Sequence, residues 1–167
     1  MSEKRIDPTV TGLFMVAFIT SSFGLLGLET YTGEDMGMKT APTLALIVGI
    51  LIAILMVSAI RYGDAFVAPL MGFVAISLIV VPYAGSGAMI ILAVIYFAFA
   101  LAGLAVKLPK MMVLLLIIVG LLYLVVGVGG LADGDIFFLL QGILGLSAGT
   151  LALYLSMALS TQKLPVR

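Results

Sequence analysis

The sequence of 167 residues contains no cysteine, no histidine and no tryptophan. Without cysteine the protein can form no disulfide and no thiolate nucleophile, and without histidine it has no imidazole base. The usual nitrogen and sulfur ligands of zinc, copper and haem iron are missing as well. We therefore expect neither a bound metal nor a cofactor.

Charged residues are also scarce. They make up 10% of the chain, eight basic against eight acidic, whereas 63% of the residues are hydrophobic. Soluble domains carry about 25% charged and about 45–50% apolar residues, so a soluble domain of this length could not bury so much apolar surface. The zero net charge and the lack of a basic cluster argue against a nucleic-acid partner. The composition predicts an integral membrane protein whose surroundings are the lipid bilayer.

Six apolar stretches are long enough to cross a membrane, for which about 20 residues are needed. Pro42, Pro82 and Pro109 fall at the ends of these stretches, where the missing N–H group does least harm. The expected fold is an all-α bundle of six transmembrane helices in a single domain, residues 1–167. The expected spans are 9–28, 42–60, 65–82, 87–106, 110–131 and 136–160.

The first span is predicted to remain in the protein, because the stretch 10–28 exceeds the roughly 7–15 apolar residues of a signal peptide. Asp7 is expected to cap this helix and Pro8 to take its first helical position. Pro69 is expected to kink the third helix or to mark a short non-helical start. The segment 30–41 is long enough to form a small cap on the outer side.

The basic residues indicate the orientation of the bundle. With a cytoplasmic N-terminus, Lys39 is the only basic residue on the outer side, which agrees with the positive-inside rule. Both termini are then cytoplasmic, and we expect a multi-pass protein of the plasma membrane. The inner side would hold Lys4, Arg5, Arg61, Lys107, Lys110, Lys163 and Arg167.

The interior of the predicted spans contains no Asp, Glu, Lys or Arg. Its polar groups are hydroxyls and one amide, and the simplest role of each hydroxyl is a hydrogen bond to a carbonyl of its own helix. These groups provide no acid–base or nucleophile set, so we do not expect an enzyme. They are Thr11, Thr20, Ser21, Ser22, Ser58, Ser77, Tyr96, Tyr123, Gln141, Ser147, Thr150, Tyr154 and Ser156.

Small residues recur along the last predicted span. Gly142, Gly145, Gly149 and Ala152 are three or four residues apart and so share one helix face, a small-xxx-small pattern that lets another helix approach closely. The pattern is compatible with packing inside the bundle and with packing between protomers.

The opening segment and the last span resemble the acetate uptake transporter family, also called the succinate–acetate permeases. The segment from Asp7 to Leu13, "DPTVTGL", keeps Pro8, Gly12 and Leu13 of that family's motif Asn-Pro-Ala-Pro-Leu-Gly-Leu. The stretches "GILGLSAGTLALYLSMA" in the last span and "RYGDAF" between the second and third spans also fit. The resemblance covers nearly the whole chain.

The resemblance implies a homo-oligomer, a hexamer, in which each six-helix protomer has its own narrow path for acetate. In the family, bulky side chains of the first, third and fifth spans pinch this path, and the aligned positions here are Val16, Val74 and Val119. A ring of valines retains the apolar character of the pinch, which can gate by dewetting, but its bore would be wider. A position of the second span that is often glutamine falls near Ile54.

The leading hypothesis is therefore a permease or channel for acetate or a similar small monocarboxylate. An anion would be held by helix N-termini and by hydroxyls such as Thr11 and Thr20. Alternatively the neutral acid crosses and transport is linked to protons, which suits a path without Lys or Arg. The candidate pathway residues are Asp7, Pro8, Thr11, Gly12, Val16, Thr20, Val74 and Val119.

Two other functions stay open at this point. One is a channel for a small neutral solute such as urea, a short amide or ammonia, since the valine pinch offers no carboxylate ligand. The other is a non-transporting structural subunit of a membrane assembly, which the stripe of small residues permits.

Overall fold

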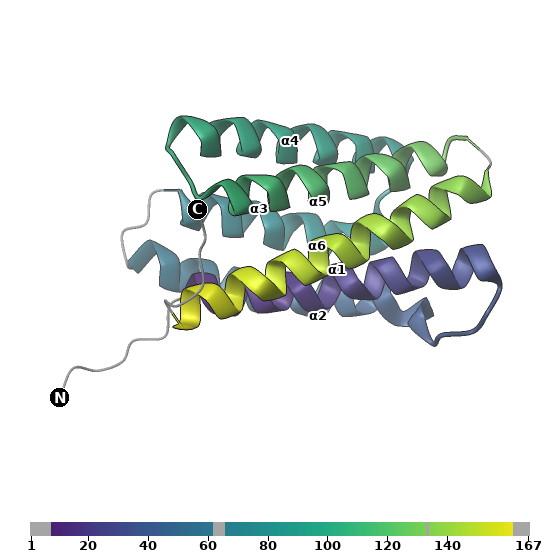
Figure 1. Cartoon of the computed structure of the whole chain (residues 1–167), viewed down its shortest axis with the longest axis horizontal. Coiled ribbons are helices and arrows are strands. Elements are labelled where there is room, and N and C mark those ends of the chain that lie inside the picture. Colours follow the sequence, from purple (N-terminus) through teal and green to yellow (C-terminus); the bar gives the residue numbers. More distant parts are fainter. Residues whose placement is uncertain (1–7, 62–65, 133, 162–167) are drawn as a thin grey trace.

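A computed structural model describes residues 8–61, 66–132 and 134–161, and it is a bundle of α-helices (Figure 1). Two short 3-10 helices are present as well: η1 (Met38–Thr40) directly precedes the second α-helix, and η2 (Val81–Tyr83) directly follows the third. The α-helices are α1 (Pro8–Thr32), α2 (Ala41–Arg61), α3 (Val67–Val80), α4 (Ser86–Ala105), α5 (Lys110–Gly129) and α6 (Asp135–Thr161).

Consecutive helices run in opposite directions, so that α1, α3 and α5 begin at one end of the bundle and α2, α4 and α6 begin at the other (Figure 1). Helix α1 packs on α6 and α2, α5 packs on α4 and α6, and α3 packs on α2. Aromatic side chains make the contact between α3 and α4: Phe73 stacks on Phe99 with ring centroids 5.3 Å apart.

Helices α1 and α6 approach closely where glycine faces glycine. A Cβ atom at Gly24 would lie 2.7 Å from the Leu146 nitrogen, which is backbone and cannot move aside. The predicted stripe of Gly142, Gly145, Gly149 and Ala152 lies on this face, and all four residues are buried. Within the chain, the stripe thus serves the packing of α6 on α1.

Two interhelical hydrogen bonds join α1 and α6 on either side of the glycine contact. The Gln141 Nε2 amide donates to the Phe23 carbonyl at 3.1 Å, and the Ser156 hydroxyl donates to the Val10 carbonyl at 2.9 Å. Each bond satisfies a polar side chain in apolar surroundings, where an unpaired group would be expensive. The predicted hydrogen bond from a hydroxyl to a carbonyl of its own helix also occurs: Thr150 donates to the Leu146 carbonyl at 2.9 Å.

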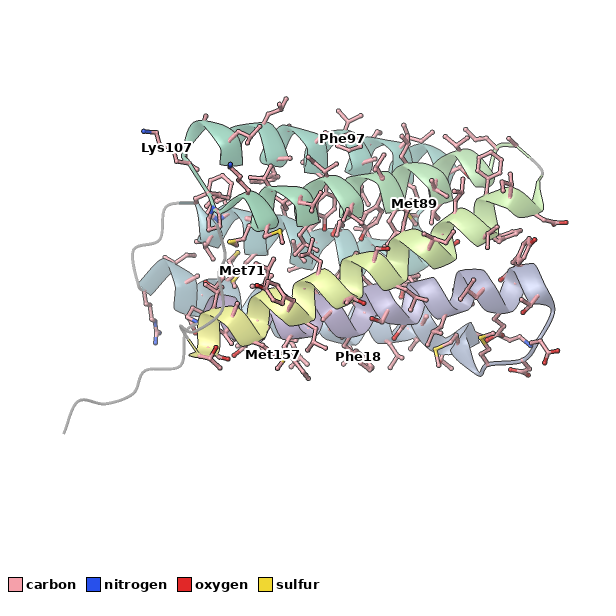
Figure 2. The ribbon with its side chains drawn as sticks, viewed as in Figure 1. Phe18, Met71, Met89, Phe97, Lys107 and Met157 are labelled. Atoms are coloured by element: carbon pink, nitrogen blue, oxygen red, sulfur yellow. The ribbon has the colours of Figure 1, made fainter. Side chains whose placement is uncertain are left out.

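The outer surface of the bundle is apolar, as a membrane protein requires. Phe18 and Met157 project from the bundle (Figure 2), and they are 51% and 54% exposed. Five helices of the described chain are long and apolar enough to span a membrane, namely α1, η1 with α2, α4, α5 and α6. Helix α3 with η2 is shorter. Of the six predicted spans, five are therefore long enough helices to cross a membrane, and the third is not.

The helices follow the predicted spans to within a few residues, with the largest difference at the end of α1. The predicted apolar span ends near residue 28, whereas the helix itself continues to Thr32. Thr30 and Thr32 donate to the Leu26 and Leu28 carbonyls at 2.9 and 2.8 Å, and these bonds fit a continued helix. The predicted outer cap is therefore shorter than expected.

The two proline predictions have different outcomes. Pro8 takes the first position of α1, as predicted. Pro69 does not kink α3, because it is the third residue of a helix that begins at Val67, where an N–H group needs no partner inside the helix. The alternative prediction for Pro69, a short non-helical start, falls mainly on residues 62–65, which lie outside the described chain, as does Asp7.

Candidate functional site: a central apolar cavity

A cavity of about 320 Å³ runs through the middle of the bundle. Helices α1, α3 and α5 form most of its wall, α2 and α4 contribute two residues each, and α6 contributes one. In the described chain no charged side chain lines it. The polar residues of the wall are Thr9, Thr20, Tyr96, Tyr123 and Gln141.

Helix α1 supplies one face of the wall with helical spacing. Thr9, Gly12, Val16 and Thr20 are three or four residues apart and line the cavity. Thr11 is a predicted pathway residue, yet it does not line the cavity, because it lies about 100° around the helix from Gly12. Pro8 is buried but is not part of the wall either. Thr9, which was not among the predicted pathway residues, lines the wall in their place, and the roles of Thr11 and Pro8 stay predictions.

Gly12 faces the side chain of Met71 across the cavity. A Cβ atom at Gly12 would lie 2.8 Å from the Met71 Cε atom. The absent side chain at position 12 thus leaves room for a flexible thioether from α3. Because a methionine can adopt several rotamers, this contact is an adjustable one.

The three valines aligned with the family's pinch, Val16, Val74 and Val119, all line the cavity. They come eight, seven and nine residues after the starts of α1, α3 and α5. At about 1.5 Å per residue these offsets correspond to depths of about 11–14 Å from the same end of the bundle. We refer to these three residues as the valine layer.

The second helix presents a different residue from the one that the sequence alignment indicates. Ile54 is 61% exposed on the outer surface, whereas Ile52 is 1% exposed and lines the cavity. A shift of two residues along a helix moves a side chain by about 200°, so the alignment in α2 selects a position on the outer surface of the bundle. Because Ile52 is the residue of α2 that lines the cavity here, the wall is apolar where the family often has glutamine.

Three hydroxyl groups from different helices meet beside the cavity, and their pairing could not be predicted because they are far apart in the sequence. The Ser77 and Tyr96 hydroxyls are 3.0 Å apart, and the Tyr123 hydroxyl donates to Ser77 Oγ at 3.4 Å. The rings of Tyr96 and Tyr123 stack with centroids 5.2 Å apart and planes at 16°. We call Ser77, Tyr96 and Tyr123 the hydroxyl trio.

Among the described residues of the cavity wall, Thr20 is the only other hydroxyl residue near the depth of the hydroxyl trio. Its hydroxyl proton is used in a hydrogen bond within helix α1. It donates to the Val16 carbonyl at 2.7 Å. This bond matches the simplest expectation for a hydroxyl in a span. Thr20 can therefore offer a solute its oxygen lone pairs more readily than its proton.

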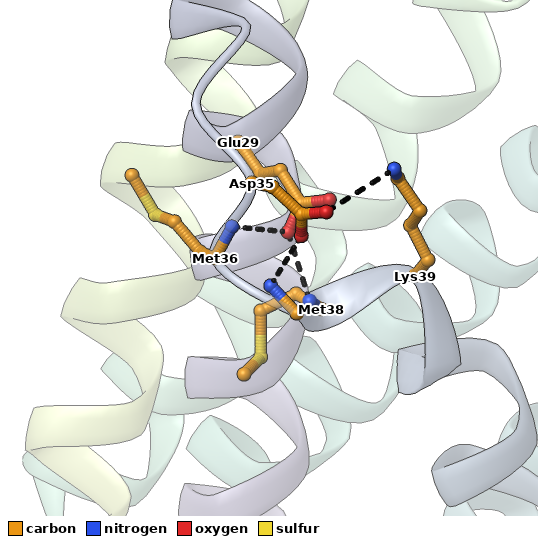
Figure 3. Close-up of polar contacts among 6 residues, drawn as sticks. Glu29, Asp35, Met36, Met38 and Lys39 are labelled. Carbon is orange, nitrogen blue, oxygen red and sulfur yellow. Dashed lines mark hydrogen bonds and ion pairs between the residues drawn. The ribbon is translucent and has the colours of Figure 1, made fainter.

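A buried carboxylate binds the backbone of the loop between α1 and α2 (Figure 3). Glu29 is 5% exposed, and its Oε2 atom accepts hydrogen bonds from the backbone N–H groups of Met36 at 3.1 Å and Met38 at 2.8 Å. Its Oε1 atom is buried and has no hydrogen-bond partner in the described chain. Next to it, Lys39 pairs with Asp35 at 3.7 Å on the exposed surface.

This loop lies next to one end of the central cavity. Leu26, on the last turns of α1, lines both the cavity and the shallow pocket under the loop that Glu29 helps to form. Pro42, which follows the loop, is also part of the cavity wall. Within the described chain no group of three or more acidic residues is placed to hold a metal ion.

Comparisons with known proteins give a structural relative and no sequence relative. Neither a protein-family model nor a curated protein matches the sequence. Among solved structures, one described as the structure of the bacterial acetate channel SatP superposes with a TM-score of 0.72. The match covers 98% of this chain and 100% of that one, at 18% sequence identity. The chain therefore has the fold of a solved bacterial acetate channel.

Proposed function

We propose that this protein is a membrane permease or channel for acetate or a similar small monocarboxylate. The observation that carries the proposal is the central cavity, with valines from α1, α3 and α5 at one depth, in a fold that matches an acetate channel. An apolar pinch of this kind excludes hydrated ions by dewetting and admits a small solute that sheds its water. The protein is a transporter and not an enzyme in this proposal.

The path itself is proposed to run along the cavity, past Gly12, the valine layer and Thr20. Asp7 would lie at its mouth, but it is outside the described chain. Because no charged group lines the described wall, an anion would have no counter-charge there. Moving an unpaired charge to the bilayer centre costs at least about 3 kcal/mol. Transport of the undissociated acid, linked to protons, fits this wall better than transport of the anion.

The proposed orientation places both termini in the cytoplasm. Arg61, Lys107 and Lys110 lie at the end of the bundle where α1 begins, and Lys39 lies with Glu29 at the opposite end. The positive-inside rule assigns the first end to the cytoplasm. A plasma-membrane location and assembly into a homo-oligomer, a hexamer by resemblance, belong to the same proposal, and native mass spectrometry of the detergent-solubilised protein would test the number of subunits.

The test of the function is uptake of labelled acetate into proteoliposomes at two pH gradients, with uptake into protein-free liposomes subtracted. Val74→Trp should plug the cavity and abolish most of the protein-dependent uptake. Ile76→Trp is the matched control, since Ile76 is two residues away on α3 and 59% exposed on the outer surface. Uptake that ignores both the gradient and the plug would rule out the proposal.

A channel for a neutral solute is the second candidate, and the uncharged cavity wall favours it. Urea flux can be followed by light scattering from the same proteoliposomes. Rapid urea flux that Val74→Trp blocks, without protein-dependent acetate uptake, would establish this alternative.

A further inference from the structure

The hydroxyl trio lies one helical turn beyond the valine layer. Ser77 follows Val74 by three residues on α3, and Tyr123 follows Val119 by four residues on α5. Three or four residues correspond to about one turn, or roughly 5 Å along the helix. Tyr96 reaches the same level from α4, and both tyrosines line the cavity. A solute that passes the valine layer in the cavity thus meets Tyr96 and Tyr123 next.

The protons of the trio can be assigned from its distances. Ser77 Oγ donates its single proton to the Val74 carbonyl at 2.8 Å. It must then accept from Tyr96 at 3.0 Å and from Tyr123 at 3.4 Å. Hydroxyl–hydroxyl bonds are usually 2.5–3.0 Å long, so the bond from Tyr123 is a weak one. The Tyr123 hydroxyl can therefore turn its proton toward a solute with little loss of hydrogen-bond energy. The phenol oxygens can still accept a hydrogen bond.

The rings hold these hydroxyls in place. Tyr96 stacks on Tyr123, and Phe73 contacts the Tyr96 ring edge-to-face with centroids 4.9 Å apart and planes at 64°. All three members of the trio are at least nine-tenths buried. Such packing fixes the orientation of the two phenols before a solute arrives.

From this arrangement we infer that the hydroxyl trio is a binding site for a small neutral solute that carries a carbonyl acceptor and an adjacent donor. The solute in question is the undissociated carboxylic acid of the proposed function, on which this inference rests. Its carbonyl oxygen accepts from Tyr123, and its acid O–H donates to a phenol oxygen. A carboxylate would need donors only, and the trio has just one proton that is free to turn.

The experiment uses three molecules of nearly the same shape as competitors of labelled acetate uptake. Acetic acid at low pH and acetamide each carry a donor and an acceptor, whereas acetone carries an acceptor only. Acetic acid and acetamide should compete, and acetone should not. Competition by acetone as strong as that by acetamide would overturn the inference.

Substitutions assign the effect to the trio. Tyr123→Phe should raise the half-saturating acetate concentration about fivefold, as the loss of one ordinary hydrogen bond predicts, and Tyr96→Phe should act in the same direction. Tyr83→Phe is the matched control, because Tyr83 is 81% exposed. Ser77→Ala gives a second, smaller change in case a tyrosine variant does not fold. Unchanged half-saturation in all three trio variants would overturn the inference.

Infrared difference spectra with ¹³C-carboxyl acetate give a readout that a merely structural role would not move. The wild type should show the carbonyl band of the bound undissociated acid, and Tyr123→Phe should shift or lose it. Carboxylate bands alone would overturn the inference. Its failure can be told from that of the proposed function: wild-type protein without any acetate uptake defeats the function, whereas normal uptake that is insensitive to the trio defeats only the site.

Discussion

Gly145 of α6 packs directly on Gly24 of α1, so closely that a Cβ atom at position 145 would lie 2.5 Å from the Gly24 Cα atom. In a bilayer, helices gain little from hydrophobic association and depend on such close packing instead. The pair therefore joins the first and last helices of the bundle, and α1 carries one wall of the cavity.

The glycine pair leads to a prediction about stability. Gly145→Ala should lower the free energy of unfolding by about 1–3 kcal/mol, because the added methyl group forces backbone apart in a packed interface. The midpoint of thermal unfolding in detergent measures the change. Gly87→Ala is the matched control, since no atom lies within 4 Å of a Cβ atom there and the helix gains a better helix former. Equal midpoints for the two variants would contradict the role of the glycine pair.

The buried carboxylate of Glu29 leads to a prediction about the loop. Glu29→Ala removes the acceptor of the Met36 and Met38 N–H groups, so amide hydrogen exchange at these two residues should accelerate at least about tenfold. Exchange measured by mass spectrometry on the purified protein gives the rates. Glu34→Ala changes an exposed acidic residue of the same loop and should leave them as they are. Similar exchange in both variants would show that Glu29 does not hold the loop.

The turn after α4 contains a residue in an unfavourable backbone conformation. Lys107 has a φ angle of 59°, the left-handed region, while the Leu108 N–H group closes the helix end on the Gly103 carbonyl at 2.9 Å. Glycine is the residue that such a helix end favours. Lys107→Gly should therefore stabilise the protein by about 0.5–1 kcal/mol, the strain relieved less the entropy of glycine.

Lys107→Ala is the control for this substitution. Alanine removes the charge as glycine does, but it keeps the Cβ atom that causes the strain. Thermal unfolding midpoints should rise for glycine and not for alanine. A rise of equal size for both would attribute the effect to the charge.

Much of the fold could be predicted from the sequence, because long apolar runs with prolines and glycines at their ends define helices in any surroundings. Hydropathy marks where the apolar run of α1 ends and not where the helix ends, and Thr30 and Thr32 belong to the helix although they are polar. The start of α3 depends on local backbone conformation around Pro69, which hydropathy does not report.

The site was only partly predictable for a different reason. Val16, Val74 and Val119 could be aligned with a family pattern, since each belongs to a single helix and its position along that helix is known. Ile52 and the hydroxyl trio could not be found, because they depend on how the helices are rotated and which helices are neighbours. Tyr96, Tyr123 and Ser77 come from three helices and meet only when the bundle has formed.

The most direct test of the central cavity as the path uses the absence of cysteine from the sequence. Val16→Cys places one thiol on the cavity wall, and Phe18→Cys places one on the outward-facing side of the same helix, where Phe18 is 51% exposed. A small water-soluble methanethiosulfonate should modify position 16 and reduce protein-dependent acetate uptake, and it should leave uptake by the Phe18→Cys variant unchanged. Complete modification at position 16, verified by mass spectrometry, with undiminished uptake would contradict a path through the cavity.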